Sequence, residues 1–67
     1  MNAWMEQVFG AKIVYKEGIV RRKRSDVRKH ASLTEFLSYI RAQKYHLIET
    51  GDQYIVICNS GAIKIHC

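Results

Sequence analysis

The sequence predicts an α+β fold with the element order ββαβββ, in which a small antiparallel sheet packs on one amphipathic helix. Two patterns indicate this class. Apolar residues recur at helical spacing after Ser32, whereas the last third of the chain alternates Ile, Val and Tyr with turn residues. Composition agrees, because 48% hydrophobic residues, 25% charged residues and no proline are typical of an ordered domain with short connections. We therefore expect residues 1–67 to form a single small domain.

The central helix is expected to begin after Ser32. Ser32 and Glu35 have the S-x-x-E spacing of a capping box, in which the serine hydroxyl accepts a hydrogen bond from the Glu35 amide. The apolar side chains that follow recur at i, i+3, i+4 and i+7 and so share one core-facing stripe: Leu33, Phe36, Leu37 and Ile40. Arg41 and Lys44 suit the negative end of the helix dipole, which predicts that the helix ends near residues 43–44.

Three strands are expected after this helix. Residues 45–50, 53–59 and 62–66 are rich in Ile, Val and Tyr, and Gly51-Asp52 and Ser60-Gly61 separate them. Such short connections predict an antiparallel meander with Ile63 and Ile65 facing the helix. Residues 53–58 are apolar on both faces, which is typical of a covered central strand.

The first third of the chain predicts a hairpin. Residues 11–15 and 19–24 have the composition of two strands, joined by Lys16-Glu17-Gly18 with glycine at the position that needs a positive φ. Residues 2–9 are compatible with a short N-terminal helix stopped at Gly10, or with an extended arm. We expect the helix.

The strongest functional signal is a basic segment at residues 21–29. It holds six of the eleven Lys and Arg residues of a chain with a net charge of +5: Arg21, Arg22, Lys23, Arg24, Arg28 and Lys29. Side chains alternate between the two faces of a strand, and only one face can cover a core. The segment is therefore predicted to be an edge strand or a β-ribbon arm, followed by a loop that leads to Ser32, with its charges in solvent.

These six cations predict phosphate contacts to nucleic acid, DNA or RNA, with low sequence specificity. Tyr15, Tyr45 and Tyr54 would stack on unpaired bases if they lay on an exposed sheet face, although tyrosine on a strand more often packs. A charged edge without a ligand is the structural alternative.

A second function class is a phage- or plasmid-type accessory protein that binds an acidic protein partner as an adaptor or inhibitor. Trp4, Met5, Val8 and Phe9 then form an apolar interface, or else they cap the core. A homodimer through an exposed strand edge, such as residues 62–66, would enlarge a small core.

Neither catalysis nor a cofactor is expected. The chain has no glycine-rich phosphate loop, no nucleophile elbow and no carboxylate pair with acid/base spacing. Cys58, His66 and Cys67 lack the spacing of zinc ligands, so no metal is predicted and both cysteines are expected to be free thiols. Without a secretory signal or a membrane-length apolar run, we expect a cytoplasmic protein that does not bind membranes.

One helix followed by three strands, over residues 33–66 and with basic character, is similar to the second half of small mRNA-cleaving toxins of the HicA type. The resemblance implies a ribonuclease with a histidine in the loop or strand start after the first of these strands. This chain reads Gly51-Asp52-Gln53 there and lacks the helix that follows in those toxins. Neither membership nor ribonuclease activity is therefore expected.

Overall fold

The computed structural model describes residues 2–67, without the side chains of residues 13 and 15. It confirms the predicted α+β class, although the order ββαβββ is not matched. The elements of the described chain are α1 (Ala3–Phe9), α2 (Lys12–Tyr15), β1 (Ile19–Lys23), α3 (Arg24–His30), α4 (Leu33–Ala42), β2 (His46–Glu49) and β3 (Gln53–Ile57).

The three strands form one antiparallel sheet in the order β1-β3-β2, so the last strand along the chain lies in the centre. Strand β1 pairs with β3 from Ile19 opposite Ile57 to Lys23 opposite Gln53. Strands β2 and β3 form the predicted hairpin around Gly51-Asp52. Its turn is closed by Thr50, whose hydroxyl accepts a hydrogen bond from the Gln53 amide at 3.0 Å.

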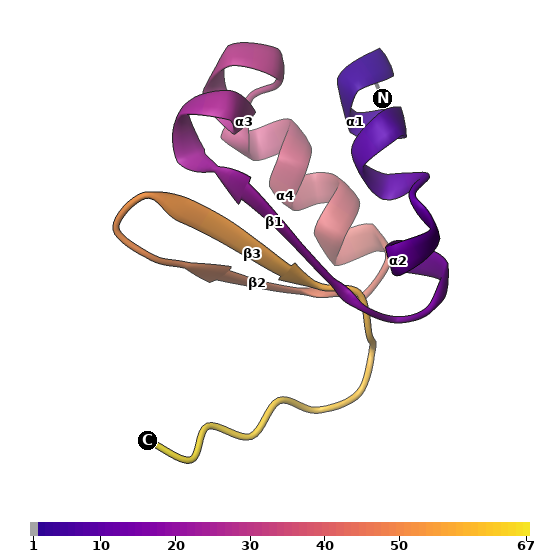
Figure 1. Ribbon diagram of the computed structural model, residues 1–67, viewed down its shortest axis with the longest axis vertical. Helices are drawn as coiled ribbons and strands as arrows, with labels where there is room; N and C mark the ends of the chain where they lie inside the picture. The colour runs from indigo at the N-terminus through magenta and orange to yellow at the C-terminus, as the bar shows by residue number, and fades with distance from the viewer. Residues whose placement is uncertain (1) are drawn as a thin grey trace.

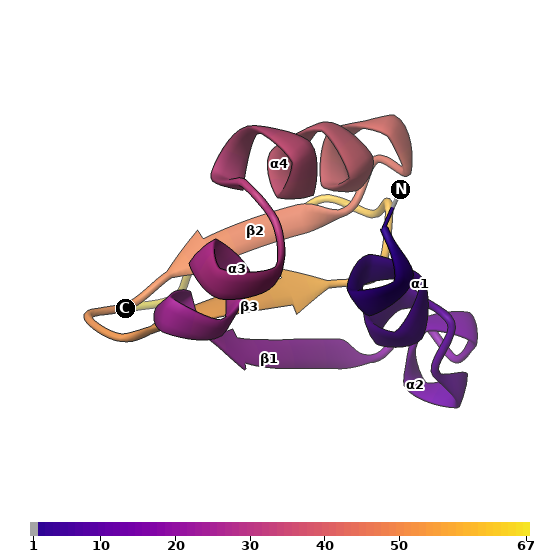
Figure 2. The same cartoon turned by 90° about the horizontal axis from the view of Figure 1, so that it is seen from above.

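The helices cover one face of this sheet and leave the other face without a helix, which we call the open face (Figures 1 and 2). Val20, Tyr54 and Val56 point toward the helices and are buried. Residues of the opposite parity, including Ile19, Arg21 and Ile48, lie on the open face. The predicted central position of β3 is confirmed, but the coverage of both its faces is not, because no helix lies on the open face and Ile55 and Ile57 remain half-buried there.

Helix α4 supplies the centre of the core, as its spacing predicts. The Ser32 hydroxyl accepts the predicted hydrogen bond from the Glu35 amide at 3.0 Å. Phe36 and Ile40 are fully buried, Leu37 is half-buried, and Leu33 is 39% exposed. The apolar stripe is thus confirmed except at its first residue, which is exposed.

The N-terminal helix is also confirmed as α1. Asn2 caps it by accepting a hydrogen bond from the Met5 amide at 2.8 Å. Met5, Val8 and Phe9 are buried against the sheet and α4, and the half-buried Trp4 packs beside them. These side chains therefore cap the core of their own domain and do not form an interface patch.

The first predicted hairpin is wrong. Residues 12–15 form the helical turn α2, and β1 takes β3 as its partner instead of residues 11–15. The residue with a positive φ is Glu17, at 57°, and not the neighbouring glycine. A three-residue apolar run, 13–15, has no periodicity that separates helix from strand, and the long-range pairing with β3 decides the outcome.

The last predicted strand, residues 62–66, is wrong as well. A tight turn at Ser60-Gly61 would place this strand beside β3, but β1 and β2 already occupy both edges of β3. Residues 59–67, which we call the C-terminal segment, are extended and run back beneath the open face (Figure 1). Ile63 and Ile65 are 41% and 80% exposed and do not face the helix.

Helix α4 ends in a Schellman motif near the predicted position. Its C-cap is Gln43, the Tyr45 amide donates to the Ile40 carbonyl at 3.0 Å, and the Lys44 amide donates to the Arg41 carbonyl at 3.0 Å. The residue in the left-handed conformation is Lys44, with φ 60°. Glycine is the usual residue there, because a Cβ makes this conformation unfavourable.

Replacing Lys44 with glycine is expected to raise the free energy of unfolding by about 1 kcal/mol, because the strain of the left-handed residue is removed. For a domain of this size the gain corresponds to about 4 to 8 °C in Tm. Thermal unfolding followed by circular dichroism measures it. Lys44→Ala is the control: it removes the same charge but keeps the Cβ, so a gain of equal size in both variants would contradict this explanation.

Candidate nucleic-acid interface

The basic segment continues from β1 directly into helix α3, where a loop was predicted. Helix α3 has Asp26 in its first turn and three basic residues in its last turn, Arg28, Lys29 and His30, so its charges complement the helix dipole at both ends. Val27 is fully buried and fixes the helix to the core. A single apolar residue in seven produces no helical periodicity. The charge order was therefore the only sequence signal for this helix.

Four cations of the segment are exposed. Arg21 and Lys23 project from the open face of β1, which is an edge strand as predicted, and Arg28 and Lys29 project from α3. We call these four side chains the basic surface. Arg22 points to the covered side of the sheet and is half-buried, and its Nη1 donates a hydrogen bond to the Arg21 carbonyl at 2.7 Å.

Arg24 has a different position from the other cations. Its amide donates to the Asp52 carbonyl at 2.8 Å, and its Nη1 donates to the Gly51 carbonyl at 3.1 Å. The guanidinium also lies 3.8 Å from a carboxylate oxygen of Glu49 and 5.9 Å from the ring centre of Tyr54. The expectation that all six cations extend into solvent is thus wrong for two of them: Arg22 is half-buried on the covered side of the sheet, and Arg24 joins the start of α3 to the β2–β3 hairpin.

A hollow of about 290 Å³ lies between the start of α3 and the tip of the hairpin. The two elements meet at the same end of the sheet (Figure 1). The hollow is lined by three cations, a serine hydroxyl and two residues of the hairpin turn: Lys23, Arg24, Ser25, Arg28, Gly51 and Asp52. Side chains of this kind donate hydrogen bonds to phosphate oxygens, with the Asp52 carboxylate as the opposing charge.

The positive charges of the basic surface are not paired with carboxylates of the described residues. Among residues 2–67, the ion pair found in the structure is that of Arg24 with Glu49, and no carboxylate pairs with the four exposed cations. Exposed and unpaired cations on neighbouring elements such as β1 and α3 produce a positive potential that attracts polyanions. This arrangement can bind phosphate without any loss of internal ion pairs.

The tyrosines do not provide the predicted stacking surface. Tyr54 is buried beneath α4, where its ring lies 6.0 Å from that of Phe36, so stacking on a base is ruled out. Tyr45 is half-buried at the opposite end of the sheet, away from the basic surface. The side chain of Tyr15 lies outside the described residues.

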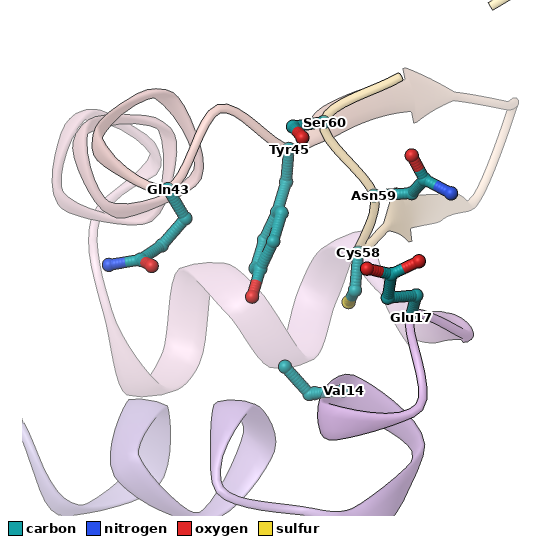
Figure 3. Close-up of a pocket in the computed structure, with 7 residues that line it drawn as sticks. All are labelled: Val14, Glu17, Gln43, Tyr45, Cys58, Asn59 and Ser60. Carbon is teal, nitrogen blue, oxygen red and sulfur yellow. The ribbon is translucent and has the colours of Figure 1, made fainter.

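A second hollow, of about 280 Å³, lies at that opposite end (Figure 3). It is lined by Val14, Glu17, Gln43, Tyr45, Cys58, Asn59 and Ser60. Burial raises the pKa of the Cys58 thiol, which therefore stays protonated at neutral pH and is a poor nucleophile and metal ligand. Nothing in this lining forms an activated catalytic pair.

Metal-ligating side chains are dispersed. Within residues 2–67, no three His, Cys, Asp or Glu side chains come close enough to hold a metal ion. His46 instead places its Nε2 2.6 Å from the Gly61 carbonyl, and His30 ends α3 with its ring stacked on Trp4 at 5.4 Å. In the same part of the chain, no helix has the length and apolar character needed to cross a bilayer.

No family model, curated protein or solved structure matches this chain. The layout that resembles HicA-type toxins is also incomplete, because two strands and not three follow α4 in residues 2–67. The functional inference therefore depends on the side chains themselves.

Proposed function

We propose that this protein binds nucleic acid, DNA or RNA, through phosphate contacts of the basic surface, and that it acts as a binding protein without catalysis. The observation that carries this proposal is that all four cations are exposed, that two of them line the hollow between α3 and the hairpin, and that no carboxylate of the described residues pairs with any of them. Lys23 and Arg28 line this hollow, while Arg21 and Lys29 extend the positive surface onto β1 and α3.

Low sequence specificity follows from the kind of contact. Phosphate contacts orient a protein on nucleic acid but carry no sequence information. Helix α3 has only seven residues and is packed on the core through Val27, so it is too short to place several side chains on base edges. We therefore expect the phosphate density of the ligand, rather than its base order, to determine affinity.

Salt dependence gives a quantitative test. Four phosphate contacts predict that log K falls with log[salt] with a slope of about −4 on duplex DNA, and about −3 on single strands. Affinity for a duplex then falls by on the order of 10² between 50 mM and 200 mM salt.

The experiment titrates the protein against labelled duplex and single-stranded DNA and RNA of equal length at these two salt concentrations, with fluorescence anisotropy as the readout. Two unrelated sequences of each type test specificity, and their affinities should agree within a few-fold. Absence of binding at the lower salt concentration would overturn the proposal. A strong preference for one sequence would instead contradict the phosphate-only mode.

A further inference from the structure

Exposed apolar side chains gather around one part of the molecule. Of the large hydrophobic residues exposed in the described chain, four are isoleucines of the open face or of the C-terminal segment: Ile19, Ile48, Ile63 and Ile65. Ile65, at 80% exposure, is the most exposed of all. Apolar side chains concentrated in this way indicate an interaction surface.

The C-terminal segment has a strand-forming sequence but no place in its own sheet. Ala62, Ile63, Lys64, Ile65 and His66 alternate as a strand does. They follow β3, whose two edges are taken by β1 and β2, so a short turn cannot bring them into the sheet. Just before these residues, the Gly61 carbonyl lies 2.6 Å from the His46 Nε2 of β2.

The outer edge of β2 offers a suitable place in a second molecule. No strand of residues 2–67 pairs with this edge. A strand added there with Ile63 and Ile65 beside Ile48 on the open face turns Lys64 to the other side, toward Glu49. The outer edge of β1 is less suitable, because the same orientation would turn Lys64 toward Arg22, which lies on the covered side of that strand.

We propose that the chain forms a homodimer by reciprocal exchange of the C-terminal segment, with residues 62–66 of each copy pairing with the outer edge of β2 in the other. This is an isologous interface, in which each copy donates the same strand and accepts it at the same edge. Backbone hydrogen bonds give affinity, the isoleucines are covered, and Lys64 meets Glu49 with opposite charge. The proposal does not depend on nucleic-acid binding.

A charge exchange between two variants tests this pairing. Lys64→Glu places two carboxylates together in its own homodimer, and Glu49→Lys places two ammonium groups together. When the two variants are mixed, both interfaces of the heterodimer carry opposite charges. We expect each variant alone to dimerise roughly tenfold more weakly than the parent, and the mixture to recover parental affinity as a heterodimer, measured by sedimentation velocity and native mass spectrometry.

The control replaces a cation outside the interface: Arg41→Glu, mixed with Glu49→Lys, should show no preference for the heterodimer. Ile63→Ser together with Ile65→Ser should abolish the dimer, whereas Leu33→Ser, which changes an exposed leucine on α4, should not. If Glu49→Lys fails to fold, the comparison of the double isoleucine variant with Leu33→Ser still tests the proposed dimer. A parent chain that stays monomeric up to about 1 mM, or a dimer unaffected by the isoleucine changes, overturns the proposal.

Discussion

Replacing the four side chains of the basic surface with glutamine is expected to lower the affinity for duplex nucleic acid by about 100-fold or more in low salt. Each lost phosphate contact also reduces the magnitude of the slope of log K against log[salt] by about 1, so the slope should rise from about −4 toward zero. The four side chains are exposed and outside the core, so the free energy of unfolding should change by less than about 0.5 kcal/mol. Anisotropy titrations and urea unfolding of the same samples measure both quantities.

The chain offers a matched control at the other end of the sheet. Four further cations are exposed on α2, on the turn that follows it, and at the end of α4: Lys12, Lys16, Arg41 and Lys44. Replacing them with glutamine removes the same net charge, but it leaves the hollow between α3 and the hairpin intact. An equal loss of affinity in both variants would show that net charge, and not the basic surface, determines binding.

Replacing Phe36 with alanine should destabilise the fold by about 3 to 5 kcal/mol. The ring is fully buried and lies within 6.3 Å of the rings of Trp4, Phe9 and Tyr54, so its loss leaves a cavity between the sheet and α1. A domain of this size has a total stability of about 3 to 10 kcal/mol, so the variant retains a small part of it at most. Urea unfolding followed by far-ultraviolet circular dichroism provides the measurement.

Leu33→Ala is the comparison on the same helix. Leu33 is 39% exposed, and its truncation should cost about 1 kcal/mol or less. If the two substitutions had similar effects, the core would not be centred on Phe36.

The sequence was most informative where structure is local. Helix α4 could be predicted with its cap, its buried stripe and its end, because a capping residue and 3.6-residue spacing act within a few residues. The hairpin of β2 and β3 could also be predicted, from its turn at Gly51-Asp52.

Strand pairing was predicted less well, because it depends on residues far apart in the chain. The sequence contained no signal that β1 would pair with β3. Hairpins were therefore expected at residues 11–24 and 53–66, and neither forms. Residues 12–15 form a helical turn instead of a strand, and residues 62–66 have no place beside β3. Propensity describes how well a residue fits a strand, and it does not identify the partner.

The candidate site shows the same division. Alternation along β1 placed Arg21 and Lys23 together, and the edge position of this strand is confirmed. Arg24 could not be separated from its neighbours in sequence, because its partners Gly51 and Glu49 come from the distant hairpin. The hollow beside α3 depends on the same long-range contact and was not predictable.

The central position of β3 has a consequence for folding kinetics. Strands β1 and β2 touch through β3, which is the last of the three along the chain. A growing chain that ends before Gln53 therefore has helices but no sheet on which to pack them, and α4 holds its apolar side chains in water until synthesis passes Ile57. Closing the long loop from β1 to β3 then becomes the slow step, and folding should begin only after nearly the whole domain has left the ribosome.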